Sequence, residues 1–237
     1  MNATILRLSA QALLGRRRFW LLLAVPLVLV VLAFVVRLLA GEGVGYDGII
    51  DGLGLRLSLP IVALMATSTV LGPEIDDGSI VYLLAKPVSR YRVALSKYVV
   101  ALAATLVFGV LPLVVASLLN DGSRPGMAVG WLAGASVSAL AYCGLFLALS
   151  AVTRHAVVVG LLFVLLWEGL LGGLLTGIRW LNLAAWGRQV AAGVDDRIAL
   201  PAQVGVTYAL VAAVVVAVLG VWFTGERLRS FSLVGGE

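Results

Sequence analysis

Long apolar stretches with very few charged residues set the strongest limit on how this chain can fold. Only 12% of its 237 residues are charged and 62% are hydrophobic, whereas about 25% are charged in an average globular chain. An α-helix of about 20 apolar residues crosses a bilayer core of about 30 Å. We therefore expect an all-α integral membrane protein with no room for a separate soluble domain.

Six stretches have the length and composition of transmembrane helices. The first follows three arginines and contains 18 uncharged residues. This is longer than the apolar core of about 7 to 15 residues in a cleaved signal peptide, so we expect it to be retained. The expected spans are 19–37, 53–72, 95–119, 127–152, 156–175 and 204–224. Together they predict a single transmembrane domain over residues 1–237.

Two segments outside the spans are expected at the membrane surface. Residues 1–18 place apolar side chains near helical spacing and end in three arginines, as in an amphipathic helix of the headgroup layer. A frayed basic tail is the alternative for this segment. Residues 176–203 include Trp180, Trp186 and several charged residues. Because tryptophan collects at membrane interfaces, we expect short interfacial helices there.

The segment 73–92 between the second and third spans has a different pattern. Acidic residues come first, a short apolar run follows, and Pro87 and a basic cluster end the segment. Ser79 can cap a short helix that stops before Pro87, and the apolar residues would share one face of it. An apolar face with charged flanks suits contact with a second protein. A solvated cap before a helix is the alternative role for the acids.

This segment resembles the cytoplasmic loop of ABC-2 type transporter permeases. The residues that carry the resemblance are an acidic stretch with Gly78-Ser79, then Leu83-Leu84-Ala85-Lys86-Pro87-Val88-Ser89-Arg90, and Lys97 seven residues later. In that family the loop contains the coupling helix that docks on the ATP-binding subunit. The resemblance implies an elbow helix at 1–18, a cytoplasmic coupling helix within 73–92, and short, partly re-entrant outer helices within 176–203.

The resemblance further implies the transmembrane subunit of an ABC exporter. Its partners would be an ABC ATP-binding subunit, a second copy or a related permease, and membrane lipid, with no nucleic acid. ATP and magnesium would be bound by the partner subunit, and we expect no cofactor or metal in this chain. The residues that would contact the ATP-binding subunit are Glu74, Asp76, Asp77, Ser79, Ile80, Leu83, Leu84, Lys86, Pro87 and Arg90.

Sequence motifs for catalysis are missing, so we do not expect an enzyme. There is no phosphate-binding Gly-x-x-x-x-Gly-Lys-Ser/Thr, and one histidine and one cysteine cannot form a catalytic triad or a multi-cysteine metal site. Glu168 and Arg56 are charged residues inside expected spans, which makes them candidates for a translocation path. For Arg56 the alternative is an anchor whose charge snorkels to the interface.

Basic residues are distributed unevenly between the two sides of a six-span topology. The side with both termini holds eleven of the 17 lysines and arginines, and the other side holds six. The positive-inside rule therefore predicts cytoplasmic termini and a cytoplasmic segment 73–92. The alternative role for Arg90 and Arg92 is to set this topology and nothing more. We expect a multi-pass protein of the plasma membrane, in a bacterial cell.

Small residues recur at every fourth position within one span and across the end of another. Such a pattern lets helices approach closely, and exposure of the small residues to lipid is the alternative. The two sets are Gly130, Gly134 and Ser138, and Gly169, Gly173 and Gly177.

Two other functional classes remain open from the sequence. A membrane scaffold or anchor would recruit a cytoplasmic partner without transport. An ion-coupled carrier would use Glu168 and work without an ATPase. The sequence identifies no substrate for any of these classes.

Overall fold

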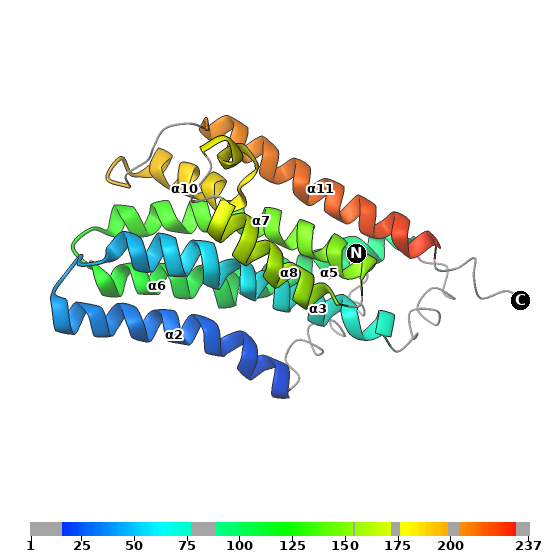
Figure 1. Ribbon diagram of the computed structural model, residues 1–237, viewed down its shortest axis with the longest axis horizontal. Helices are drawn as coiled ribbons and strands as arrows, with labels where there is room; N and C mark the ends of the chain where they lie inside the picture. Colours follow the sequence, from blue (N-terminus) through cyan, green and yellow to red (C-terminus); the bar gives the residue numbers. More distant parts are fainter. Residues whose placement is uncertain (1–15, 77–88, 154, 172–175, 199–203, 231–237) are drawn as a thin grey trace, which may run out of the picture.

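The computed structural model is a bundle of helices that run roughly along one axis (Figure 1). The structure describes residues 16–76, 89–153, 155–171, 176–198 and 204–230, and within them every regular element is a helix. In chain order the elements are α2 (Arg16–Ala40), η1 (Gly48–Ser58), α3 (Leu59–Asp76), α5 (Arg90–Thr105), η2 (Leu106–Val110), α6 (Leu111–Asn120), α7 (Pro125–Val152), α8 (Ala156–Leu162), η3 (Phe163–Leu171), η4 (Thr176–Leu181), α10 (Leu183–Val194) and α11 (Val206–Ser230).

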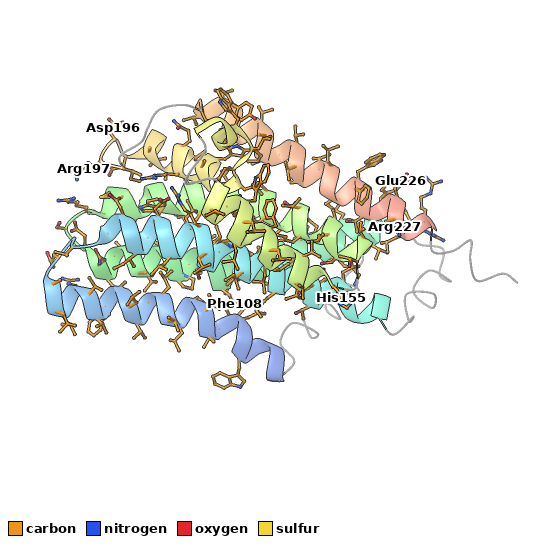
Figure 2. All side chains as sticks on the ribbon, in the orientation of Figure 1. Phe108, His155, Asp196, Arg197, Glu226 and Arg227 are labelled. Carbon is orange, nitrogen blue, oxygen red and sulfur yellow. The ribbon has the colours of Figure 1, made fainter. Side chains whose placement is uncertain are left out.

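We name the two ends of the bundle by the helices that meet there. At the α6–α7 end, the end of α2 lies beside the turn from α6 to α7 (Figure 1). At the opposite α5–α11 end, α5 begins where α11 ends. Side chains show the same separation, because Asp196 and Arg197 lie at the first end and Glu226 and Arg227 at the second (Figure 2).

Five helical segments of the described chain are long and apolar enough to cross a membrane. They are Leu22–Ala40, Gly48–Leu71, Arg90–Asn120, Pro125–Val152 and Val206–Arg229. These segments agree with the expected all-α integral membrane protein.

The sixth expected span, 156–175, coincides with α8 and η3. The apolar helix there, Ala156–Leu170, is shorter than the other five. A count of six spans therefore stays a prediction. The elbow helix also stays a prediction, because most of it, residues 1–15, lies outside the described part of the chain.

Two π-helical segments end just before a proline. Pro60 follows η1 by two residues, and Pro112 follows η2 by two. Proline has no N–H to donate, and its ring clashes with the carbonyl four residues earlier, which disrupts the regular α-helical ladder. Widened π turns are one way to absorb such a break. The sequence thus explains why the second and third helical spans are not uniform α-helices.

Helix α7 is the centre of the bundle. It packs against α3, α6, α10 and α11. Its Trp131, Tyr142 and Phe146 are fully buried, and the rings of Tyr142 and Phe146 stack with centroids 5.8 Å apart. Large aromatic side chains contribute most of the buried area in such a core.

The small residues of α7 form the contact with α10. A methyl group on Gly134 would lie 2.2 Å from the carbonyl oxygen of Gly187, and one on Gly130 would lie 2.8 Å from that of Ala191. The hydroxyl of Ser138 donates to the carbonyl of Leu183 at 2.8 Å. The prediction of a close helix approach along this set is therefore confirmed.

The second small-residue set does not form such a contact where it is described. Gly169 and Gly177 would each accept a methyl group without a clash, and Gly173 lies outside the described residues. A close approach that was not predicted joins α7 to α11 instead. A methyl group on Gly220 would lie 2.2 Å from the carbonyl oxygen of Gly144.

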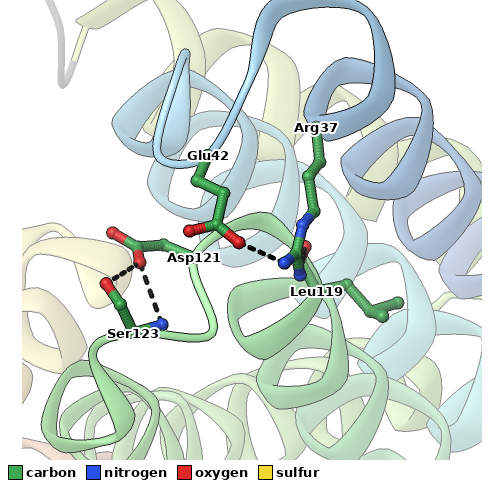
Figure 3. Close-up of polar contacts among 5 residues, drawn as sticks. All are labelled: Arg37, Glu42, Leu119, Asp121 and Ser123. Carbon is green, nitrogen blue, oxygen red and sulfur yellow. Dashed lines mark hydrogen bonds and ion pairs between the residues drawn. The ribbon is translucent and has the colours of Figure 1, made fainter.

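Polar contacts close the bundle at the α6–α7 end (Figure 3). Arg37 donates to the carbonyl of Leu119 at 3.0 Å and pairs with Glu42, and Ser123 donates to Asp121. The Leu119 carbonyl is one of the four at the end of α6 that have no partner within their own helix. Arg37, at the end of the first span, therefore caps a neighbouring helix.

Candidate functional site

Glu168 is fully buried where η3 meets the start of α10. One of its carboxylate oxygens accepts the N–H of Leu183 at 2.9 Å, and the other accepts the N–H of Ala184 at 3.3 Å. Asn182 caps the next N–H, that of Ala185, at 2.7 Å. Both interactions satisfy donors that an α-helix leaves free at its N-terminus, where the helix dipole also favours negative charge. Glu168 therefore holds the beginning of α10 in place.

The start of α10 lies inside the bundle and not at its surface. Its first residue, Leu183, contacts Ser138, in the middle of α7, and Asp195, just past its end, lies close to Gly126 near the start of α7. Helix α10 therefore runs from the interior to the α6–α7 end, alongside part of α7 (Figure 1). The expected outer segment 176–203 contains this helix and the short 3₁₀ helix η4.

Arg56 lies close to the same region, in an ion-paired cluster. Its Nη2 is 3.0 Å from Oδ2 of Asp51 in the same π-helical segment, and Nη1 of Arg188 on α10 is 3.2 Å from that same oxygen. We call these three residues the arginine–aspartate cluster. The cluster ties α10 to η1. Arg56 is thus paired inside the protein, and its place in a translocation path stays a prediction.

A buried tyrosine, Tyr142, lies near Glu168 within the bundle. Its hydroxyl is buried and approaches the Glu168 carboxylate without reaching hydrogen-bond geometry. Glu168 and Arg56, the two residues predicted for a path, lie on η3 and η1, which pack against each other. They contribute to one polar region between η1, η3, α7 and α10.

A second polar site lies at the α5–α11 end. Arg90, at the start of α5, donates to the carbonyls of Leu228 and Arg229 at 2.7 and 3.1 Å. These carbonyls belong to the last turn of α11, where the helix dipole favours a cation. We call this contact the α5–α11 junction. Arg90 therefore has a structural partner, and its predicted contact with an ATP-binding subunit stays a prediction.

Tyr91 reinforces the junction from the next position. Its hydroxyl donates to the carboxylate of Glu226, and a methyl group on Gly225 would lie 2.4 Å from its ring. Behind it, Ala94 and Leu228 are both buried and pack together. The first turns of α5 thus contact the last turns of α11 through both hydrogen bonds and apolar packing.

Lys97 connects α5 to α3 near this end. Its side chain is fully buried, and Nζ donates to the carbonyl of Val70 at 2.7 Å. A buried ammonium requires such acceptors, because burial without them is very costly. Lys97 and Arg90 together place α5 between α3 and α11.

The other residues predicted to contact an ATP-binding subunit are not placed by the structure. Glu74 and Asp76 belong to the last turn of α3, but their side chains are outside the described set. Those outside the described residues altogether are Asp77, Ser79, Ile80, Leu83, Leu84, Lys86 and Pro87. The helices that flank these residues in the chain are α3, which ends at Asp76, and α5, which begins at Arg90 at the α5–α11 end.

Sequence reasoning missed Asp51, Arg188 and Tyr91 as site residues. Asp51 and Arg188 are 137 positions apart, and each resembles an ordinary charge outside a span. The signal that could have suggested their pairing is the small residue Gly187 beside Arg188, which allows α10 to pack deeply on α7. For Tyr91 the sequence gives no comparable signal.

Comparison with known proteins gives one family. The family model described as ABC-2 family transporter protein matches residues 14–180. This stretch runs from the start of α2 into η4 and includes Asp51, Arg56, Arg90 and Glu168. A comparison with curated proteins gives no match.

Proposed function

This chain belongs to the ABC-2 transporter family, and from that membership we propose that it is the permease subunit of an ATP-driven exporter. It would form the translocation path with a second copy or a related permease. A separate ATP-binding subunit would bind magnesium and ATP and hydrolyse the nucleotide. The chain itself would supply motion and a path, with no cofactor and no catalytic residue.

The observation that carries this proposal is the position of the segment 77–88 between α3 and α5. Helix α5 begins at Arg90, directly after this segment, and its first turn is joined to the end of α11 through the α5–α11 junction. Lys97 joins α5 to α3 as well. A force applied to the segment by a partner would therefore reach three membrane helices together. This linkage supports a coupling role for the segment.

We assign the contact with the ATP-binding subunit to the acids and the short apolar run before Pro87. Glu74, Asp76 and Asp77 would pair with basic residues of the partner, at the cytoplasmic side of the membrane. Closure of the partner upon ATP binding would pull the segment, tilt the attached helices and open the path outward. Arg90 would transmit this movement to α11 as a positioning residue.

The test is charge reversal in the segment. The tagged chain is expressed with the ATP-binding subunit that co-purifies with it, and ATP hydrolysis and subunit association are measured in lipid nanodiscs. The double variant Asp76→Lys, Asp77→Lys should insert normally, bind the partner more weakly and lose stimulation of ATP hydrolysis. The matched control Asp195→Lys, Asp196→Lys changes the same number of charges at the opposite end of the bundle and should leave both measurements unchanged.

Two results would overturn the proposal. One is wild-type association and ATP hydrolysis in the Asp76, Asp77 double variant. The other is the failure of any ATP-hydrolysing subunit to co-purify with the wild-type chain under conditions in which the chain is folded. The second result would favour a membrane anchor or a carrier that works without ATP.

A further inference from the structure

Two arginines converge on one oxygen of one aspartate inside the membrane-spanning bundle. Arg56 and Arg188 approach Oδ2 of Asp51 at 3.0 and 3.2 Å, from η1 and from α10. The side chain of Asp51 is only 8% exposed. The arginine–aspartate cluster therefore carries two positive charges and one negative charge in a largely buried position.

The cluster has more donors than its aspartate can use. A guanidinium group has five N–H donors, and Asp51 is the one ion-pair partner of each arginine among the described residues. Nε of Arg188 and Oδ1 of Asp51 are both buried and have no hydrogen-bond partner in the described part of the chain. Unfilled donors around a net positive charge are a favourable environment for an oxygen-rich anion.

Nearby acids do not remove this excess charge. Glu168 is another buried carboxylate of this region, and both of its oxygens are used by the N–H groups of Leu183 and Ala184. These N–H groups carry the positive end of the α10 dipole, which offsets the charge of Glu168. The positive charge of the two arginines is therefore balanced only in part.

The cluster is also accessible from one side. The side chain of Arg56 is 33% exposed, although it lies within the candidate span Gly48–Leu71. Charged groups in membrane segments almost always face the bundle interior or a water-filled route, because contact with lipid is costly. The exposed side of Arg56 therefore faces a polar route, a second protein copy or the membrane interface, and a polar group can reach the cluster from that side.

We propose that Arg56 and Arg188 form a binding site for an anionic group, a carboxylate or a phosphate, on the substrate that moves through the path. Asp51 is the resident counter-ion, which the incoming anion displaces from the two guanidinium groups. The planar fork of arginine matches both kinds of anion with two parallel hydrogen bonds. This inference rests on the proposed transport function, and it adds a substrate class to it.

Because Asp51 competes with the incoming anion, its removal should strengthen anion binding. Removal of either arginine should weaken it. The full-length chain is placed in phosphatidylcholine nanodiscs without an ATP-binding subunit, and binding of octyl phosphate is measured by isothermal titration. We expect saturable binding. Arg56→Gln and Arg188→Gln should each weaken it by about tenfold or more, and Asp51→Asn should strengthen it by about threefold to tenfold.

Controls separate recognition from folding and from general charge. Arg124→Gln removes an exposed arginine that pairs with Asp121 at 3.2 Å at the α6–α7 end, and it should leave binding unchanged. Arg56→Lys keeps the charge but loses the fork, and it should give an intermediate affinity. If Arg188→Gln does not fold, Arg56→Gln and Asp51→Asn still decide the result. Thermal unfolding of every variant shows which ones keep the wild-type structure.

A second arm identifies the source of the anion. The titration is repeated in nanodiscs of phosphatidylglycerol, whose headgroups carry a net negative charge, unlike the zwitterionic headgroups of phosphatidylcholine. Loss of octyl phosphate binding there shows that lipid phosphate occupies the site, and unchanged binding shows that the site takes its anion from the polar route. Either result supports the anion site.

The inference is overturned if the wild-type chain shows no saturable binding, or if Arg56→Gln binds as Arg124→Gln does. It is also overturned if a folded Asp51→Asn variant binds more weakly than the wild type. Because the partner subunit is absent from this experiment, such a failure removes the anion site and leaves the proposed function intact. If no ATP-binding subunit associates with the chain, the proposed function fails, and the titration still decides whether the anion site exists.

Discussion

The start of α10 is held by a negatively charged side chain and the end of α11 by a positively charged one. Glu168 accepts N–H groups at the beginning of α10, whereas Arg90 donates to carbonyls at the end of α11. Both arrangements satisfy free backbone groups and place a charge where it interacts favourably with the helix dipole. The two helices are therefore fixed by the same physical principle with the signs reversed.

The two contacts differ in burial and in packing. The α10 contact is fully buried, and glycine backbones of α7 and α10 touch beside it. The α5–α11 junction is partly exposed and consists mainly of side chains that reach across to another helix. Exposed hydrogen bonds open at lower free-energy cost than buried ones. We therefore expect α10 to be a fixed part of the bundle and the junction to be the part that can rearrange.

The largest effect is expected from Gly187→Val, which breaks the packing of α10. A side chain there would meet Ser138 and the Gly134 carbonyl at 2.1 and 2.6 Å. Because backbone cannot move aside as a flexible side chain can, we expect a loss of about 3 kcal/mol or more in unfolding free energy. Thermal unfolding in detergent measures it. Gly205→Val is the matched control, since nothing lies within 4 Å of that position, and equal stability of the two variants would contradict the close approach.

The next effect is expected from Glu168→Ala, which removes the carboxylate at the start of α10. Two buried N–H groups would lose their acceptor, and we expect a loss of about 3 kcal/mol. Glu168→Gln keeps one acceptor oxygen and should lose about half as much. Thermal unfolding measures both. Wild-type stability of Glu168→Ala would show that the start of α10 does not depend on this residue.

A smaller effect on stability is expected from Arg90→Gln at the α5–α11 junction. The partly exposed hydrogen bonds to the end of α11 should contribute about 1 to 2 kcal/mol. The same variant should lower the stimulation of ATP hydrolysis in the complex more than it lowers stability, because it disconnects α11. Arg92→Gln, two positions away and exposed, is the control. Parallel losses of activity and stability in both variants would refute a special role for Arg90.

The smallest effect is expected from Ser138→Ala. It removes one buried hydrogen bond to the Leu183 carbonyl and should cost about 1 kcal/mol. Ser136→Ala is the control, because the Ser136 hydroxyl donates within its own helix, to the Leu132 carbonyl. Thermal unfolding of the two variants sharpens the view that α10 is fixed by its contact with α7. Equal stability of the variants would weaken that view.

Much of the membrane architecture could be predicted from the sequence. The expected spans 19–37, 95–119 and 127–152 lie where α2, α5 to α6 and α7 are found. The glycines of α7 also predicted a close contact. These features are local, because hydropathy and small-residue spacing are read along a single helix.

The candidate site could be predicted only in part. Glu168 and Arg56 were singled out because charge inside a span is costly. Their partners could not be named, because a carboxylate in a span can be satisfied by a base, a helix N-terminus or water. The contact of Arg90 with a partner stays a prediction, and its contact with the end of α11 could not be foreseen.

Hydropathy along the chain is enough to identify a helical membrane protein in which few positions tolerate a charge, because the long apolar runs require the bilayer. The tertiary structure decided which charges meet. Asp51 and Arg188 come together only because α10 packs deeply against α7 through glycine. Ion pairs between distant segments depend on how helices dock, and the pattern of one helix does not contain that information.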